Sequence, residues 1–331
     1  MIKFVGAIVL ALSVAACGTA KTGTAANVAA VMPAPAASTA SPNVTVLAQQ
    51  LTMPGLNRQR TVRIYVPPGY ATSTKRYPVL YMHDGQNLFD KATAYAGEWG
   101  VDETLDSLAQ TQGLELIVVG IDNGGDKRVT ELNAWDHDRF GKGEGKRYMD
   151  FIVDVVKPLV DARYRTRPER EHTGVMGSSM GGLISHYAIL QYPQVFSKAG
   201  IFSPAYWLGP EVFGLTANQA PAADVRLALY MGGGEGQEAV TDYQRMVAQL
   251  QRQSHPVANL WVKLTPGAAH NEEAWRVEFA AAVAWMLAPG KWPGQTHVGT
   301  TSLRRSDDFS GRGLHVLVLT PTMGTRRVFE P

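Results

Sequence analysis

The stretch GVMGSSMGGLISHY, from Gly174 to Tyr187, joins an apolar run to a glycine- and serine-rich turn and then to residues with helical spacing. A strand followed by a tight turn and a helix is the unit from which parallel α/β sheets are built. Residues 177–181, Gly-Ser-Ser-Met-Gly, match the pattern G-x-S-x-G, in which a sharp turn presents a serine above the sheet. The alternative interpretation is a plain glycine-rich connection.

Strand and helix patterns alternate on both sides of this stretch. Short apolar runs that end in turn residues are typical of parallel strands buried on both faces, and a further run, RTVRIYV, has strand alternation. Together these segments predict one doubly wound α/β domain, with a mostly parallel sheet and helices on both faces. The other strand runs are YPVLYMHDG, LELIVVGIDNG, TGVMGS, KAGIFS, VRLALYMGG and ANLWVKLTPG; the helical runs are EWGVDETLDSLAQ, YMDFIVDVVKPLVDARY, QEAVTDYQRMVAQLQRQ and NEEAWRVEFAAAVAWML.

Composition limits the class of protein. The 331 residues are 45% hydrophobic and carry a formal net charge of +2, which suits a globular chain with a sizeable core. Basic residues form no long run, so the sequence lacks the signature of a nucleic-acid-binding protein. The single cysteine, Cys17, excludes an intramolecular disulfide and a cysteine-based zinc site.

The first residues have the pattern of an export signal. An apolar run from Phe4 to Val14 is too short to span a membrane and is followed by small residues. VAAC, residues 14–17, resembles the lipobox of bacterial lipoproteins, which predicts a signal peptide over residues 1–17 and a lipid anchor on Cys17. With Gly18 next, the resemblance implies an outer-membrane lipoprotein facing the periplasm. The alternative is an ordinary signal peptide cut just before the cysteine.

Two further segments differ in composition from the predicted domain. Residues 18–43 are mostly Ala, Thr, Pro and Ser with little charge, and they predict a flexible tether. The α/β domain is expected over residues 44–288. Residues 289–331 break the alternation and predict an irregular C-terminal extension with one strand-like run, LHVLVLT.

Ser179 is the predicted nucleophile. Glycines near it leave room for a strained turn, and the helix that begins there directs its positive end at developing negative charge. The backbone N–H of Met180 is then placed to stabilise an oxyanion. A bare G-x-S-x-G pattern is common, so the prediction depends on the strand before it and the helix after it.

A serine nucleophile needs a base and an acid, which α/β folds supply from the ends of later strands. His270 follows the strand-like run WVKLTPG and precedes a helix, so it is the best placed of the eight histidines. Glu235, in the turn GGGEGQE, is the first acidic residue after an earlier strand. Glu238 and Asp242 are the alternatives for the acid.

The other histidines suit structural roles better. His186 falls inside a helix and is expected to be packed, and His137 in WDHDRF suggests either a metal ligand or, more typically, a solvated loop. GGGEG and GKGEGKR do not match the spacing of a nucleotide-binding loop. The remaining histidines lie in polar connectors or in the C-terminal extension: His172, His255, His297 and His315.

Several blocks of the chain, in order, resemble the bacterial "Putative esterase" family. This family includes enterochelin-esterase-like proteins, belongs to the α/β-hydrolase superfamily and is related to feruloyl esterases and mycolyltransferases. The resemblance covers roughly residues 44–288. The matching blocks are YPVLYMHDGQNLFD, EWGVDETL, VVGIDNGGDKRVTEL, KPLVDARYRT, GSSMGGLISHYAILQYPQVFSKAGIFSPAYW, YMGGGEG and HNEEAW.

The resemblance implies an α/β-hydrolase fold and a role for each matching residue. It implies Ser179 as nucleophile, His270 as base and Glu235 as acid, with the backbone N–H groups of Met180 and Gln86 as oxyanion donors. Gln86 belongs to the HDGQN loop, residues 83–87. The residues implied to shape this loop and the substrate pocket are His83, Asp84, Asn87, Trp99, Arg128 and Trp207. Trp99, Trp135, Tyr206 and Trp207 suit either an acyl or sugar pocket or core packing. Arg128 and Glu131 match an R..E spacing that suits either an ion pair or substrate contact.

The expected function is hydrolysis of carboxylic esters through an acyl-enzyme, with no metal and no cofactor. The expected partners are a small-molecule or glycan ester and, through the lipid anchor, a membrane; no nucleic acid is expected. Siderophore, glycan and short-chain esters remain alternatives. Acyl transfer to a sugar or lipid is a rival, and a tethered binding protein without turnover is a second rival.

Overall fold

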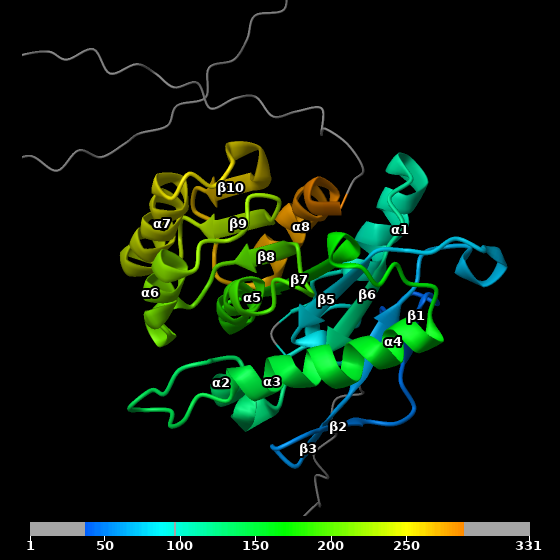
Figure 1. Cartoon of the computed structure of the whole chain (residues 1–331). Coiled ribbons are helices and arrows are strands. Elements are labelled where there is room, and N and C mark those ends of the chain that lie inside the picture. Colours follow the sequence, from blue (N-terminus) through cyan, green and yellow to red (C-terminus); the bar gives the residue numbers. More distant parts are fainter. Residues whose placement is uncertain (1–36, 96, 288–331) are drawn as a thin grey trace, which may run out of the picture. The chain divides into compact units, whose positions relative to one another are not determined.

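The computed structural model describes residues 37–95 and 97–287. The predicted signal peptide, Cys17, most of the tether and the C-terminal extension lie outside these residues. The described chain builds an eight-stranded sheet in the order β1-β4-β6-β5-β7-β8-β9-β10 (Figure 1). Its strands are β1 (Val44–Val46), β4 (Val62–Tyr65), β5 (Val79–His83), β6 (Ile117–Ile121), β7 (Thr173–Ser178), β8 (Lys198–Phe202), β9 (Arg226–Gly232) and β10 (Leu260–Thr265).

The sheet is mostly parallel, as predicted. Strands β5 to β10 all run parallel to one another. At one edge of the sheet, β4 pairs antiparallel with β6, and β1 pairs antiparallel with β4. A separate hairpin of β2 (Leu51–Met53) and β3 (Arg58–Arg60) stands apart from the sheet. The sequence patterns predict neither this hairpin nor β1, because these three-residue strands are too short to show alternation.

The predicted helices all form, and the short α2 and α6 are additions that the sequence patterns do not predict. The long predicted helix after Gly145 forms as α3 and α4, joined by a π-helical turn, η4 (Ile152–Val156). The helices are α1 (Val101–Gln112), α2 (Arg128–Glu131), α3 (Gly145–Phe151), α4 (Lys157–Arg163), α5 (Met180–Gln191), α6 (Glu211–Asn218), α7 (Gln237–Arg252) and α8 (Glu272–Leu287). None of the described helices has the length and hydrophobicity to cross a membrane.

Both faces of the sheet are buried, which explains the continuous apolar runs of its strands. On one face, Tyr81, Val175 and Ile201 join a hydrophobic core with residues of α5, such as Leu183. Successive strand residues point to opposite faces, so Phe202 lies on the other side. There its ring stacks on Trp99, 5.6 Å away, beside α1 and α8, which pack against each other.

The fold gathers several loops at one edge of the sheet. Because β5, β7, β8, β9 and β10 are parallel, their carboxyl ends meet at the same edge, where α/β proteins bind ligands. The loops that begin there start at residues 84, 179, 203, 233 and 266. All segments predicted to carry the chemistry therefore converge.

The last residues of the predicted tether are bound to the domain. The Ser41 N–H donates to Asp102 Oδ2 at 2.7 Å, and the Thr39 hydroxyl donates to Glu98 Oε1 at 2.8 Å. Asn43 Nδ2 donates to Asp106 at 3.0 Å. Residues 39–43, which the sequence analysis assigns to the tether, thus make fixed contacts with the domain ahead of Val44.

Candidate active site

Ser179 occupies a strained turn between β7 and α5. Its φ of 58° and ψ of −119° lie in a region that residues with a side chain rarely adopt. A Cβ on Gly177 would come within 2.8 Å of the Gly181 backbone, so only glycine fits there. The Ser179 N–H donates to the Phe202 carbonyl at 2.9 Å, and the Ala205 N–H donates to the Ser179 carbonyl at 3.0 Å. These bonds hold the turn in the conformation that G-x-S-x-G predicts.

The predicted oxyanion donors lie on neighbouring loops. Met180 begins α5, so its N–H has no partner within the helix, and Gln86 lies in the short helix η2 (Gly85–Asn87) after β5. A Cβ on Gly181 would lie 3.3 Å from the Cβ of His83, which places the start of α5 against the HDGQN loop. The Gln86 side chain accepts from the Asn123 N–H at 3.1 Å and is thereby anchored away from its own backbone N–H.

Asp84 holds the HDGQN loop in shape through an ion pair. It has a φ of 55°, and Arg128 contacts it through two hydrogen bonds, Nε to Oδ1 at 2.6 Å and Nη2 to Oδ2 at 2.9 Å. Asn123 Nδ2 also donates to Oδ1, at 2.6 Å. Burial alone would raise the pKa of Asp84, but the Arg128 guanidinium and these hydrogen bonds outweigh it and lower the pKa. Asp84 is therefore a charged structural anchor.

His83 is buried beneath the same loop. Its Nδ1 lies 2.8 Å from the Tyr148 hydroxyl, and its Nε2 has no hydrogen-bond partner. Burial lowers the pKa of His83 to about 4, which keeps the ring neutral at pH 7. Both placements support the interpretation that His83 and Asp84 shape the loop.

His270 and Glu235 meet at the end of the sheet. His270 Nδ1 lies 2.6 Å from Glu235 Oε2, and the Glu235 side chain is only 2% exposed, against 43% for His270. The other carboxylate oxygen, Oε1, accepts from the Ser203 hydroxyl at 2.5 Å and from the Gly232 N–H at 2.8 Å. A buried carboxylate with both oxygens bonded fixes one ring nitrogen of His270 and leaves Nε2 to face a substrate.

The geometry favours Glu235 over the two alternatives for the acid. Glu238 and Asp242 lie on α7, Glu238 is exposed, and neither forms a hydrogen bond with His270 in the described structure. Glu235 comes three residues after β9 ends, in the turn that points back at the loop after β10.

Three further residues support the site and are not predicted from the sequence. Ser203, with a φ of 42°, bridges Glu235 and the Trp275 indole, whose Nε1 donates to the Ser203 hydroxyl at 2.9 Å. Glu272, at the start of α8, accepts from Asn87 Nδ2 at 3.2 Å, and burial raises its pKa. The Ser-Pro pair directly after β8 is the signal that could have indicated Ser203.

The proposed pocket residues divide into buried and exposed groups. Trp99 is 2% exposed and Tyr206 is 1% exposed, so both belong to the core and not to a pocket wall, whereas Trp207 is 54% exposed. Asn87 is buried, and its Oδ1 accepts from the Tyr95 N–H at 3.0 Å. Trp135 packs edge-on against Tyr187, 5.6 Å between ring centroids.

The R..E pair does not form an internal ion pair. Arg128 bonds Asp84, while Glu131 is buried and bonds Arg58 at 2.8 Å and also Arg60. The hairpin of β2 and β3 thus supplies the partners of Glu131. Arg128 is left 28% exposed beside the HDGQN loop.

The other histidines take structural positions. His186 is fully buried in α5, with Nδ1 2.9 Å from the Tyr206 hydroxyl, as predicted. His137 lies in a loop closed by its hydrogen bonds with Gly141, and it belongs to no potential metal-binding group within the described residues. His255, expected in a polar connector, is instead buried, with Nε2 3.0 Å from the Val225 carbonyl.

Comparison with known proteins identifies the family of the chain. The model of the "Putative esterase" family matches residues 54–286. The uncharacterized protein YbbA of Bacillus subtilis is 28% identical over 246 residues, which cover 70% of this chain and 94% of YbbA. A xylanase/feruloyl esterase of Xylanibacter ruminicola is 23% identical over 47% of this chain and 21% of its own length.

A solved structure supports the fold. Enterochelin esterase of Shigella flexneri superimposes with a TM-score of 0.61 and 20% identity, covering 76% of this chain and 59% of that chain. With the family match spanning most of the described domain, the chain belongs to the "Putative esterase" family and is a carboxylic ester hydrolase.

Proposed function

We propose that Ser179, His270 and Glu235 form the catalytic triad of this esterase. The observation that carries the proposal is the His270–Glu235 contact of 2.6 Å at the sheet edge where Ser179 sits in its strained turn. Ser179 Oγ attacks the ester carbonyl carbon while His270 Nε2 takes the hydroxyl proton. Glu235 accepts the Nδ1–H bond and stabilises the imidazolium that forms.

Two N–H groups stabilise the oxyanion in this mechanism. The Met180 N–H at the start of α5 and the Gln86 N–H in η2 are the donors, and the α5 dipole adds to their effect. Loss of one such donor costs about 100-fold to 1,000-fold in rate in other acyl-transfer enzymes. His270 then returns its proton to the leaving alcohol, and the acyl group remains on Ser179.

Water completes the reaction. His270 takes a proton from water, the resulting hydroxide attacks the acyl carbonyl, and Ser179 leaves with the proton from the imidazolium, which releases the acid. A sugar or lipid hydroxyl in place of water would make the same residues an acyltransferase. Hydrolysis is the better supported reading because the family match is to esterases.

The substrate proposed here is an ester with a flat ring next to the scissile bond. Trp207 exposes 54% of its surface two residues beyond Ala205, whose N–H is bonded to the Ser179 carbonyl. Exposed indoles stack on aromatic or sugar rings. Two of the proteins similar to this chain are named for ring-bearing esters: one is a xylanase/feruloyl esterase and another an enterochelin esterase. Siderophore and glycan esters thus rank ahead of short-chain esters.

The test compares the chain lacking residues 1–17 with its Ser179→Ala variant. Substrates are p-nitrophenyl acetate, butyrate and octanoate, methyl ferulate and a catecholate siderophore ester, with labelling by a fluorophosphonate probe. We expect turnover and labelling to vanish together in Ser179→Ala, and the ring-bearing esters to give the highest kcat/KM. A folded wild type that neither turns over nor reacts with the probe would favour the non-catalytic rival.

Export and lipidation are proposed on the sequence of residues 1–17 alone. The expected result in a bacterial host is a protein in the outer-membrane fraction that labels with palmitate. Cys17→Ser is expected to remove the label and release the protein from the membrane fraction. Labelling that persists in Cys17→Ser would contradict the proposal.

A further inference from the structure

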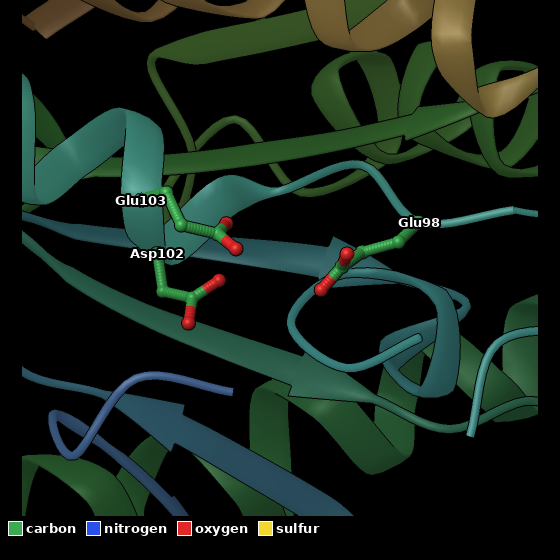
Figure 2. Close-up of side chains that lie close together, drawn as sticks. All are labelled: Glu98, Asp102 and Glu103. Carbon is green, nitrogen blue, oxygen red and sulfur yellow. The ribbon is translucent and has the colours of Figure 1, made fainter. Parts of the chain in front are cut away.

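Three carboxylates that belong to no part of the proposed triad converge at the start of α1. Glu98 precedes the helix, and Asp102 and Glu103 lie in its first turn. Each offers one oxygen such that the three atoms lie within 4.8 Å of one another. Figure 2 shows the three carboxyl groups extending into the same space. Like charges this close repel one another unless a cation or a proton lies between them.

A second observation points to a missing partner. Asp102 is 0% exposed, and although its Oδ2 accepts the Ser41 N–H at 2.7 Å, its Oδ1 is buried without a hydrogen-bond partner. Glu103 Oε2 is also buried and has no partner. Buried carboxylate oxygens are nearly always bonded, because leaving one unpaired in a dry environment is costly.

Protein cations do not fill this gap. No salt bridge to Glu98, Asp102 or Glu103 exists in the described structure, and Arg276 of α8 acts on Glu98 only through its charge. Asp90 faces Glu98 as a further negative charge. The Thr39 hydroxyl uses Glu98 Oε1 at 2.8 Å, which leaves the second oxygen of that carboxylate. The cluster is therefore rich in negative charge and poor in donors.

We infer that Glu98, Asp102 and Glu103 bind a calcium ion. Calcium takes oxygen ligands at about 2.3–2.6 Å, so two oxygens bound to one calcium ion lie at most about 5.2 Å apart, and the three oxygens, all within 4.8 Å of one another, meet this limit. Magnesium demands bonds of about 2.0–2.1 Å in a near-ideal octahedron, and zinc prefers nitrogen and sulfur. Glu98 and Glu103 are only partly buried, so water completes the coordination shell.

The three ligands lie within residues 98–103, but they and the neighbouring Trp99 contact segments that are distant in sequence. Ser41 reaches Asp102 from the N-terminal segment, Trp99 next to Glu98 packs on Phe202 and Trp275, and α1 follows. Binding thus stabilises the fold, and it takes no part in ester hydrolysis. The inference stands or falls independently of the proposed triad.

The experiment measures calcium binding directly. The chain without residues 1–17 is treated with EDTA, desalted and titrated with CaCl₂ at pH 8, where Asp102, whose pKa burial raises to about 7, is ionised. We expect one ion per chain by calorimetry, and a rise in Tm of about 5 °C or more at saturating calcium. MgCl₂ is expected to give a much smaller rise. Terbium, a calcium analogue, is expected to give luminescence on excitation of tryptophan.

Matched variants locate the site. Asp102→Asn and Glu103→Gln are each expected to lose the calcium-dependent rise in Tm and the terbium signal while keeping esterase activity. Asp126→Asn, at a carboxylate that is 82% exposed, is expected to behave as wild type. Wild type without a calcium-dependent rise at pH 8, or Asp102→Asn with the full rise, would overturn the inference. Higher stability at pH 5 than at pH 8 without a calcium response would indicate a shared proton instead.

Discussion

Glu235 and Asp102 are both buried carboxylates near helix starts, yet their surroundings differ. Every oxygen of Glu235 has a protein partner: Ser203 and Gly232 on Oε1 and His270 on Oε2. Asp102 has one partner on Oδ2 and none on Oδ1. A carboxylate whose two oxygens both have partners can orient a neighbouring side chain. A carboxylate with one unpartnered oxygen, called half-bonded below, can still bind a ligand from outside the chain. The count of partners separates a positioning group from a binding group.

The largest expected effect is on kcat and comes from replacing Glu235, the carboxylate whose oxygens both have partners. Glu235→Gln is expected to lower kcat by about 100-fold to 10,000-fold, because the amide can donate to His270 Nδ1 and favour the tautomer that cannot act as a base. Steady-state kinetics on p-nitrophenyl acetate measures it. Glu238→Gln on α7 is the matched control and is expected to keep wild-type kcat. Equal losses in both variants would argue against Glu235 as the acid.

A second contrast lies between His186, which is buried in the core, and the same histidine in the unfolded chain. Burial lowers the pKa of His186 to about 3, whereas an unfolded histidine titrates near 6.5. Between these values the unfolded chain binds the extra proton, so this contribution to stability is complete above pH 6.5 and falls as the pH drops. From pH 6.5 to pH 5 the loss is about 2 kcal/mol.

The variant His186→Leu isolates this contribution. We expect urea unfolding to show a smaller fall in stability between pH 6.5 and pH 5 than in wild type, even if the variant starts lower because Tyr206 and Thr216 lose their ring partner. His137→Gln, in the loop, is the control and should leave the pH dependence unchanged. An unchanged slope in His186→Leu would show that the ring is not buried as a neutral group.

Replacing the half-bonded carboxylate, Asp102, is expected to stabilise the protein, whereas replacing Glu235 is expected to impair catalysis. In EDTA at pH 8, Asp102→Asn is expected to raise the free energy of unfolding by about 1–2 kcal/mol, because it removes a buried charge without a partner. Urea unfolding in chelator measures it, with Asp126→Asn as control. A destabilised but folded Asp102→Asn in chelator would mean that the protein already compensates this charge.

The smallest expected effects, on stability and on kcat, come from replacing Ser203, which donates a hydrogen bond to Glu235. Ser203→Ala removes one hydrogen bond to Glu235 and leaves the Trp275 indole without its acceptor. We expect a loss of about 1 kcal/mol in stability and a fall in kcat of roughly tenfold. Both values come from parallel denaturation and kinetic measurements. A fall as large as that of Glu235→Gln would mean that Ser203 itself acts on the substrate.

The central sheet could be predicted because its strands are long and apolar on both faces. TGVMGS and VRLALYMGG became β7 and β9, and both carry a predicted site residue just after their ends. The hairpin strand Arg58–Arg60 could not be predicted, because RQR has no apolar pattern and its function is to pair charge. Local patterns thus reveal buried strands and miss polar ones.

Contacts between distant segments limited what could be predicted of the site. The positions of Ser179 and His270 just after strands were predicted from the G-x-S-x-G match, the strand ends and the chain order, and the structure has both residues there. Arg128 was matched by spacing to Glu131, but its partner proved to be Asp84, 44 residues away. The Ser-Pro pair after β8 is the one local sign of Ser203, whose role depends on a positive φ. Asp102 carries no local signal, since its role depends on an unpaired oxygen.

The strand order has a consequence for how the enzyme gains activity during synthesis. From β7 the chain adds β8, β9 and β10 outward in sequence order, so the nucleophile turn leaves the ribosome well before the loops of Glu235 and His270. Domains generally fold as units during synthesis. Ser179 therefore meets its proposed partners only after the chain has been made past residue 270, and esterase activity is expected to appear only once the sheet is complete.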